Sequence, residues 1–495
     1  MKAVLAYDLG GTSLRAGLVD QVGKLVGPAV VKCALTLDER GFSEMDPEGW
    51  WKDLLHATDL LLDLPQASVI EVVGVCLGGI TRTQVFLDGK GQPLRPAINW
   101  ADSRAALEAE EIRVSQASMG LAGETYGPIN AFHPLARLVW LKKKEPDIFR
   151  QLASVVEPKD YLNFRLTGKL ASDVPAQARL LRRTDDRFAQ ELCLAVGLSP
   201  GLFPILLPPE EMVGRVKSGL PPPLDRLVGR PVLVGSMDAW LAALGLGANH
   251  AGRAFNISGT SEVLGLVTTK KVEAPGLVDL PWGSGLFQIG GPSQAGADCL
   301  AWLAELFGRT EPSALLNDLD SFARNQESVL FLPYLRGERV PLWKASARGL
   351  FLGLNRNHGR TDLIWAVLEG VAMANHQVLS LAEKACGEPA DEVRIGGGAA
   401  RSETWCQVKA DVLGRPVIRT ENPEPGLLGA AMVAWVGLNK FNTFDEAESA
   451  MVKVERRFNF DPVRTQAYDR LFELWLQVQA AVLPLTQALV ETSLG

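Results

Sequence analysis

The chain has 495 residues, of which 47% are hydrophobic and 22% are charged, and its formal net charge is −7. A chain of this length exceeds what one hydrophobic core organises, so we expect two domains, with enough apolar residues to fill both. The negative balance, without a basic block, argues against a nucleic-acid partner or an anionic membrane, so a phosphorylated ligand has to be held locally.

Targeting and metal-binding signals are weak. Residue Met1 leads directly into an apolar stretch, and the longest apolar stretch, residues 232–248, contains Asp238 and several glycines. These features predict a cytoplasmic protein with no membrane-spanning segment. The six cysteines and five histidines are scattered without metal-ligand spacing, so we expect buried reduced thiols and assign the histidines no role.

The first predicted element is a strand that ends at Asp8, passes through a glycine turn and returns as a second strand. Glycines let the backbone turn several N–H groups toward an anion, hydroxyls add donors, and a neighbouring carboxylate can hold the Mg²⁺ that accompanies nucleotide phosphates. The alternative is a simple hairpin without a ligand. The residues of this turn are Gly10, Gly11, Thr12 and Ser13.

A second copy of this pattern lies at residues 255–267, 248 positions after the first. Six of the thirteen aligned positions are identical, although so few matches among common residue types could arise by chance. A second pair of apolar segments that end in glycines, residues 72–79 and 392–398, agrees with a repeat. The pattern predicts two topologically similar halves, each of which presents a phosphate-binding hairpin to a shared cleft.

Between the two hairpins, the sequence predicts helices and one polar loop. Asp46 is expected to cap a helix that begins at a proline, and residues 133–149 and 159–166 are expected to be helical. Trp100, which polar residues flank, suits a polyol because sugar C–H groups pack on an aromatic ring. The alternative is a helix entry in which Asp102 or Ser103 caps the next segment.

Asp238 follows a strand of buried type and opens an apolar helix. It is either an N-terminal helix residue or a base for phosphoryl transfer. In the second half, a helix over 361–385 is expected to end at Gly387, and Ser402 is expected to cap a helix that stops at Gly414.

The glycines at 396–398 precede that second helix and suit an adenosine or an α-phosphate. They lack the Gly-x-Gly-x-x-Gly fingerprint, which disfavours a Rossmann dinucleotide site.

The chain resembles FGGY-family carbohydrate kinases over nearly its whole length. The resemblance rests on residues 7–13 (YDLGGTS), 235–239 (GSMDA), 257–261 (ISGTS), 349–354 (GLFLGL) and 396–402 (GGGAARS). It implies an α/β fold of two ribonuclease H-like (actin-type ATPase) domains around a central cleft, and ATP-dependent phosphorylation of a sugar or polyol hydroxyl.

The domains implied by the resemblance are residues 1–246, for sugar binding and the catalytic base, and 247–495, for nucleotide binding. It also implies that Asp238 is the general base and that Asp8 helps to place Mg²⁺. The residues implied to face ATP are Gly10, Gly11, Thr12, Ser13, Gly259 and Thr260 at the phosphates, with Gly397, Gly398 and Ala399 at the adenosine.

Within the family, xylulokinases are most similar, through residues 94–98 and 134–140. Two departures concern the sugar: Thr81 and Arg82 replace a Met-His pair, and Arg137 replaces a lysine. We expect Thr81, Arg82 and Trp100 to line the sugar pocket with Asp238. Arg82 either contacts a sugar of different hydroxyl pattern, or even an acidic sugar, or forms an internal ion pair.

The main hypothesis is a kinase for a ketopentose such as xylulose, with kinases for other sugars or polyols as alternatives. A catalytically silent sugar sensor and an actin-type ATPase that drives a partner protein are the rivals from other classes. Asp238 favours the enzyme, and the chain lacks an added DNA-binding segment of the kind a sensor carries. The expected partner is a small sugar or polyol, with a homodimer as one assembly that the sequence allows.

Overall fold

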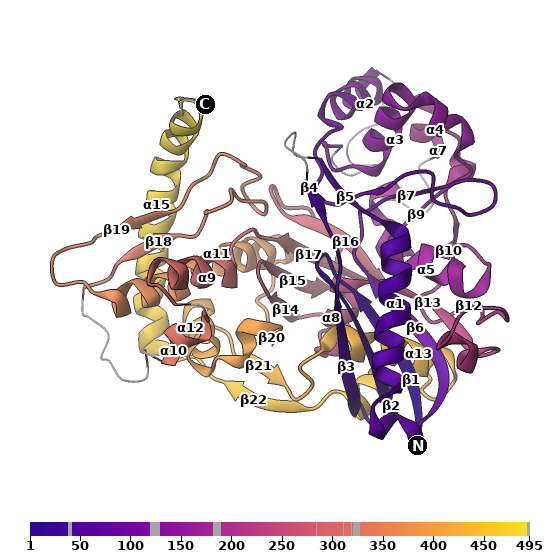
Figure 1. The fold of residues 1–495 in the computed structure, drawn as a ribbon. Coiled ribbons are helices and arrows are strands. Elements are labelled where there is room, and N and C mark those ends of the chain that lie inside the picture. The colour runs from indigo at the N-terminus through magenta and orange to yellow at the C-terminus, as the bar shows by residue number, and fades with distance from the viewer. Residues whose placement is uncertain are drawn as a thin grey trace. The chain divides into compact units, whose positions relative to one another are not determined.

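The computed structural model describes residues 1–37, 42–118, 129–181, 190–283, 285–309, 311–317, 319 and 327–492 (Figure 1). Internal contacts divide it into two compact units. Unit 1 contains Met1–Gly245 and Glu424–Val452, and unit 2 contains Leu246–Pro423 and Lys453–Gly495. The expected division between residues 246 and 247 lies one residue after the boundary between Gly245 and Leu246, and it assigned to the second domain the segment Glu424–Val452, which packs with unit 1.

Unit 1 is built on a six-stranded sheet with the order β12-β13-β6-β1-β2-β3. Its strands are β1 (Lys2–Leu9), β2 (Ser13–Asp20), β3 (Leu25–Lys32), β6 (Glu71–Gly79), β12 (Met212–Arg215) and β13 (Pro231–Met237). β1, β6 and β13 are mutually parallel, and the register pairs Leu9 with Gly79 and Gly79 with Met237. The carboxyl ends of these three strands therefore meet at one edge of the sheet.

Helices cover both faces of this sheet. α1 (Pro47–Leu62) packs on β2 and β3, and α5 (Pro158–Thr167) packs on β6, β12 and β13 (Figure 1). α13 (Pro425–Gly437) lies against β1, β2, β6 and β13 and packs closely on α8 (Asp238–Gly245). Alternate residues of β1 belong to the core beneath α1, and Asp8 points to the opposite face because successive strand residues alternate.

The rest of unit 1 is a helical region with small strand pairs. Its helices are α2 (Ala106–Ser118), α3 (Pro134–Lys144), α4 (Pro146–Gln151), α6 (Val174–Gln177), α7 (Gln190–Ala195) and α14 (Phe444–Met451), with 3-10 turns η1 (Pro65–Val69), η2 (Ala178–Leu180), η3 (Pro200–Leu202) and η4 (Leu224–Leu227). Its short strands are β4 (Thr36–Leu37), β5 (Ser43–Met45), β7 (Val85–Leu87), β8 (Ala97–Ile98), β9 (Ser154–Val156), β10 (Ala171–Ser172) and β11 (Ile205–Leu206). One apolar core joins α3 to Phe86 and Ile98, which flank the loops that leave the central sheet.

Unit 2 is built on a seven-stranded sheet with the order β16-β17-β15-β14-β20-β21-β22. Its strands are β14 (Arg253–Ser258), β15 (Glu262–Thr268), β16 (Val278–Gly283), β17 (Leu286–Pro292), β20 (Glu392–Gly396), β21 (Val417–Thr420) and β22 (Val454–Phe458). β14, β20 and β21 are parallel, and β15, β17 and β22 are antiparallel to their neighbours. The strands β22-β21-β20-β14-β15-β17 thus have the same spatial order and directions as β12-β13-β6-β1-β2-β3 of unit 1. This shared topology confirms the predicted repeat.

Helices and one further strand pair complete unit 2. They are α9 (Ala297–Leu306), α10 (Ser313–Asn317), α11 (Arg360–Cys386), η6 (Gly398–Arg401), α12 (Glu403–Leu413), α15 (Pro462–Thr492), β18 (Leu330–Leu332) and β19 (Leu350–Leu352). α11 contacts α9, α12, β15, β17 and β18, so it lies at the centre of the core of this unit. Among the described residues, no helix combines the length and apolarity that crossing a membrane requires.

Several predicted helix boundaries are confirmed. The Asp46 carboxylate accepts a hydrogen bond from the N–H of Glu48, and the Ser402 hydroxyl accepts one from the N–H of Trp405. Gly387 and Gly414 end α11 and α12 in the left-handed conformation. These local devices act within a few residues, which is why the sequence reveals them.

Two local predictions are refined by the structure. The expected helical residues 133–149 form two helices, α3 and α4, because Pro146 has no N–H to continue the first one. Of the two alternatives for the segment at Trp100, a cap of α2 by Asp102 is not observed: its carboxylate accepts hydrogen bonds from the N–H groups of Ser43 and Arg104 and from the guanidinium of Arg104, so it fixes the loop that precedes the helix.

Candidate active site

Two carboxylates stand at the edge where the parallel strands of unit 1 end. Asp8 is the penultimate residue of β1, and Asp238 follows β13 and opens α8. Asp8 pairs with Gly78 of β6, and the strand end that delivers Asp238 pairs with Gly79. Parallel strands thus bring together two acids that are 230 residues apart in the sequence.

The environment of Asp238 suits a general base. Burial, followed by the negative charge of Asp8, raises the pKa of Asp238 from 3.8 to about 7, while the N–H of Ala239 and the charge of Arg82 oppose the rise. The Ala239 N–H donates to Asp238 Oδ1 at 2.7 Å, so the helix start holds the carboxylate in place. A base with a pKa near 7 combines a substantial ionised fraction with real proton affinity.

Asp8 lies against the first turn of α13. A Cβ atom added at Gly426 would come within 2.4 Å of Asp8 Oδ2, so a side chain at this position would displace the carboxylate. Burial raises the pKa of Asp8 to about 6, the charge of Arg15 lowers it, and Glu424 raises it. Arg15 forms an ion pair with Glu424 at 3.3 Å, and this pair flanks the acid.

The turn between β1 and β2 presents its glycines and hydroxyls beside these acids. The Gly10 N–H donates to the carbonyl of Ser13 at 2.9 Å, which closes the turn, and Thr12 is exposed. A Cβ atom at Gly11 would lie 3.7 Å from Nε1 of Trp100, so the Trp100 indole borders the turn.

Arg82 occupies a left-handed backbone conformation, with φ of 55°, in the loop after β6. Burial lowers the pKa of Arg82, and the charges of Glu157 and Asp238 raise it. The Glu157 carboxylate is 4% exposed and accepts hydrogen bonds from the N–H groups of Thr83 and Arg82. Burial, and then the charge of Asp160, raises the pKa of Glu157 to about 8.

Unit 2 carries the matching turn between β14 and β15. The Gly259 N–H donates to the carbonyl of Ser261 at 3.1 Å, and Thr260 is exposed, as Thr12 is in unit 1. The carbonyls of Gly259 and Thr260 accept hydrogen bonds from the N–H groups of Ala297 and Asp298 at the start of α9. These hydrogen bonds therefore anchor the turn to the start of α9, while Thr260 stays exposed.

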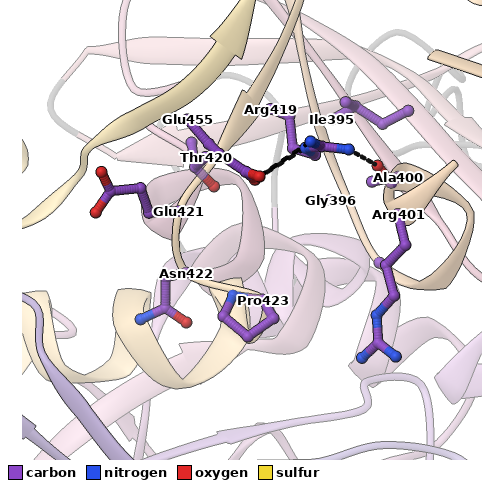
Figure 2. Close-up of a pocket in the computed structure, with 11 residues that line it drawn as sticks. Ile395, Gly396, Ala400, Arg401, Arg419, Thr420, Glu421, Asn422, Pro423 and Glu455 are labelled. Atoms are coloured by element: carbon purple, nitrogen blue, oxygen red, sulfur yellow. Dashed lines mark hydrogen bonds and ion pairs between the residues drawn. The ribbon is translucent and has the colours of Figure 1, made fainter. Parts of the chain in front are cut away.

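A pocket of about 230 Å³ opens beside the glycine segment that follows β20 (Figure 2). Its lining residues are Ile395, Gly396, Gly397, Ala400, Arg401, Arg419, Thr420, Glu421, Asn422, Pro423 and Glu455. Figure 2 shows Arg419 between Glu455 and the carbonyl of Ala400, and the distance from Arg419 Nε to Glu455 Oε2 is 2.9 Å. The volume of this pocket lies below the roughly 300–1,000 Å³ of typical small-ligand sites.

Of the three predicted adenosine residues, Gly397 lines this pocket, whereas Gly398 and Ala399 do not belong to its lining. Gly397 has φ of 94°, and a Cβ atom there would come within 2.4 Å of the carbonyl of Ser258, so the glycine packs on the phosphate-type turn. A Cβ atom at Gly398 would meet nothing within 4 Å. Ala399 is 6% exposed and its methyl group belongs to the core.

The predicted residues thus gather within each unit. In unit 1, charge coupling links Asp238 to both Asp8 and Arg82, and Trp100 borders Gly11. In unit 2, Gly397 packs on the strand that leads to Gly259. Thr81 lies in the loop between β6 and β7, one residue before Arg82.

Within the described parts of the chain, no group of three or more His, Cys, Asp or Glu side chains could hold a metal ion. Mg²⁺ that accompanies a nucleotide is bound by one or two carboxylates, with phosphate oxygens and waters completing its shell. Asp8 fits this requirement, because its carboxylate lies at the end of β1, directly before the glycine turn that is expected to face phosphate.

Three residues of the site escaped the sequence reasoning. Glu157 was overlooked because its partner is a loop 74 residues earlier, although a Glu before a Pro at a helix start signals a cap. Gly426 has no local signal in the sequence that connects it with Asp8. Arg137 was noted only as a departure from relatives, whereas it is fully buried and donates hydrogen bonds to the loops that carry Arg82 and Trp100.

Comparison with known proteins agrees with this geometry. The N-terminal domain of the FGGY family of carbohydrate kinases matches residues 3–245, and its C-terminal domain matches residues 254–438. The xylulose kinase of Escherichia coli (strain K12) is 32% identical, covering 96% of this chain and 100% of that protein. The xylulose kinase of Bacillus subtilis (strain 168) is 28% identical, covering 99% of each.

Similarity extends to a gluconokinase of Bacillus subtilis (strain 168), which is 25% identical over 89% of each chain. The crystal structure of a xyloylose kinase from Brucella ovis is 29% identical with a TM-score of 0.86, covering 98% of this chain and 100% of that one. The FGGY kinases have the actin-like ATPase fold, which confirms the expected fold class. The chain belongs to the FGGY family of carbohydrate kinases and is a sugar kinase.

Proposed function

We propose that this kinase transfers the terminal phosphoryl group of ATP to a hydroxyl group of a ketopentose such as xylulose. The observation that carries the proposal is the pair of acids at the parallel strand ends of unit 1, with Asp238 poised at a pKa of about 7. The xylulose kinases that align with nearly the whole chain support the ketopentose.

In the proposed reaction, Asp238 accepts the proton of the attacking hydroxyl as its oxygen bonds to phosphorus and the bond to the leaving diphosphate breaks. Asp8, with Asp238 nearby, would hold Mg²⁺, which supplies charge neutralisation at the phosphates. Phosphoryl transfer needs mainly positioning and electrostatic stabilisation, so the turns and loops around these acids carry much of the catalysis.

The two units would divide the ligands. In unit 1, Thr81, Arg82 and Trp100 would bind the sugar near Asp238, and Gly10, Gly11, Thr12 and Ser13 would face phosphate. In unit 2, Gly259 and Thr260 would face phosphate, and Gly397, Gly398 and Ala399 would border the adenosine. The exposed threonine hydroxyls and the pocket beside Gly397 support this division.

A sugar acid is the second candidate substrate. Arg82 places a cation in the field of Asp238, and a substrate carboxylate could pair with it. The gluconokinase that aligns with this chain supports this alternative. The acids Asp8 and Asp238 at the strand ends disfavour an anionic substrate, so the ketopentose is preferred.

The test is ATP turnover by the purified chain, followed as ADP release, against ketopentoses, aldoses, polyols and gluconate. We expect the highest kcat/KM for a ketopentose, with one ADP released per sugar phosphate formed. The highest kcat/KM for gluconate would favour the second candidate. Sugar binding without ADP release for every compound would support a sensor and contradict the kinase reaction.

A further inference from the structure

Arg137 connects the two loops that the proposed function assigns to the sugar. It lies on α3 and is 0% exposed. Its guanidinium donates to the carbonyl of Trp100 at 3.2 Å, to that of Asp102 at 3.0 Å, and to that of Arg82. One side chain therefore holds main-chain atoms of two loops that are 18 residues apart in the sequence.

The first loop needs such support because of its backbone conformation. Arg82 has φ of 55°, a left-handed conformation that is strained for a residue with a Cβ atom and persists only when its surroundings hold it. Glu157 accepts hydrogen bonds from the N–H groups of Arg82 and Thr83 on one side of this residue. Arg137 donates to the Arg82 carbonyl on the other side, so both peptide groups that flank the Cα atom of Arg82 are held.

The second loop is held in a similar way. The N–H of Trp100 donates to Oγ1 of Thr83 at 3.2 Å, which links the two loops directly. The Asp102 carboxylate accepts a hydrogen bond from Nε of Arg104 at 2.9 Å and another from the N–H of Ser43. Arg137 adds the hydrogen bonds to the carbonyls of Trp100 and Asp102, and Trp100 thereby keeps its place beside Gly11.

An arginine suits this connection better than a lysine or an apolar residue. Its planar fork carries several donors in fixed directions, whereas the ammonium of lysine is a single point with three donors. The buried cation is costly: burial lowers the pKa of Arg137 to about 10, against the favourable charges of Asp102 and Glu157. An apolar side chain would fill the space without this cost, so the contribution of Arg137 lies in the connection.

We propose that Arg137 is a positioning residue for sugar specificity, which fixes the Arg82 loop and the Trp100 loop relative to each other. The proposal rests on the proposed function, in which these loops line the sugar pocket. It separates Arg137 from residues that touch the substrate, because its two terminal guanidinium nitrogens donate to main-chain carbonyls of both loops, while its Nε is buried without a hydrogen-bond partner.

The test compares Arg137→Met and Arg137→Lys with the unsubstituted enzyme on its best sugar, on two poorer sugars and on ATP. We expect Arg137→Met to raise the KM for the best sugar about tenfold to hundredfold and to compress the differences in kcat/KM among the sugars. The KM for ATP should stay within about twofold. The KM of Arg137→Lys for the best sugar should lie between those of the unsubstituted enzyme and Arg137→Met, because lysine keeps the positive charge but lacks the planar guanidinium.

The matched control is Leu138→Ala, which removes apolar packing from the next residue of the same helix and no hydrogen bond to either loop. It should lower the melting temperature and leave the ranking of sugars unchanged. An unchanged ranking in a folded Arg137→Met or Arg137→Lys variant, or the same altered ranking in Leu138→Ala, would overturn the inference. Failure of the unsubstituted enzyme to phosphorylate any sugar would instead overturn the proposed function on which it rests.

Discussion

Replacement of Lys409 by methionine is expected to destabilise unit 2 strongly. Lys409 and Glu262 are each 1% exposed and form an ion pair of 2.8 Å at the base of the turn that carries Gly259. Lys409 Nζ also donates to Oδ1 of Asn256 at 2.6 Å, Oδ1 of Asn375 at 3.0 Å and the Ser258 hydroxyl at 3.2 Å. Methionine would leave all of these buried acceptors without their cation.

The magnitude follows from this burial. Removal of one member of a buried ion pair costs about 3–5 kcal/mol, because the other charge stays buried without compensation. For a unit of this size, each kcal/mol lowers the melting temperature by about 2–4 °C, so we expect a drop of roughly 10 °C. The KM for ATP should rise as well, since Glu262 directly follows the turn that faces phosphate in the proposed function.

The assay is thermal and urea unfolding of Lys409→Met, Glu262→Gln and the double variant, without ligand. The double variant should be more stable than Lys409→Met, because glutamine removes the uncompensated charge and its carbonyl oxygen keeps one of the two acceptors that serve Asn256 and Ser258. A loss below about 1 kcal/mol in Lys409→Met, or losses that simply add in the double variant, would refute the reasoning.

The remaining predictions concern the proposed ligand sites and one buried acid. Gly11→Val and Gly259→Val should each fold but lose ATP affinity, because an added Cβ atom has its first contact at 3.7 Å and 3.6 Å respectively; unchanged nucleotide binding in a titration would make that turn purely structural. Arg82→Ala should raise the sugar KM and change the ranking of sugars at constant ATP affinity, whereas equal losses on all sugars with a lowered melting temperature would indicate a structural ion pair. Glu157→Gln should gain stability relative to the unsubstituted protein as the pH rises from about 5 to 8. The reason is that folding raises the pKa of Glu157 from 4.5 to about 8, so between these values the unsubstituted protein must bind a proton to fold and loses stability with rising pH, whereas glutamine does not titrate; a pH-independent difference in melting temperature would contradict this.

The sequence predicted the features that depend on neighbouring residues. The two glycine hairpins, the cap at Asp46 and the glycine end of α11 all follow from contacts within a few positions. The repeat of the hairpin also predicted the shared strand order of the two units, because the same local motif begins each sheet.

The sequence could not predict features that depend on distant packing. α13 is buried on all sides from Pro425 to Trp435, so its composition does not indicate which sheet it covers. The contact of Gly426 with Asp8 therefore remained hidden, as did the membership of Glu424–Val452 in unit 1. The hydrogen bonds from Arg137 to three loop carbonyls likewise exist only once α3 has docked on these loops.

The central claim is that Asp238 is the base for phosphoryl transfer, and the most direct measurement is the kcat of Asp238→Asn with MgATP and the best sugar. Asparagine retains the acceptor for the Ala239 N–H, so the helix start should persist, as a melting curve can verify. We predict a fall in kcat of about 10²-fold or more, with ATP affinity nearly unchanged. A folded Asp238→Asn variant with turnover close to that of the unsubstituted enzyme would contradict the account.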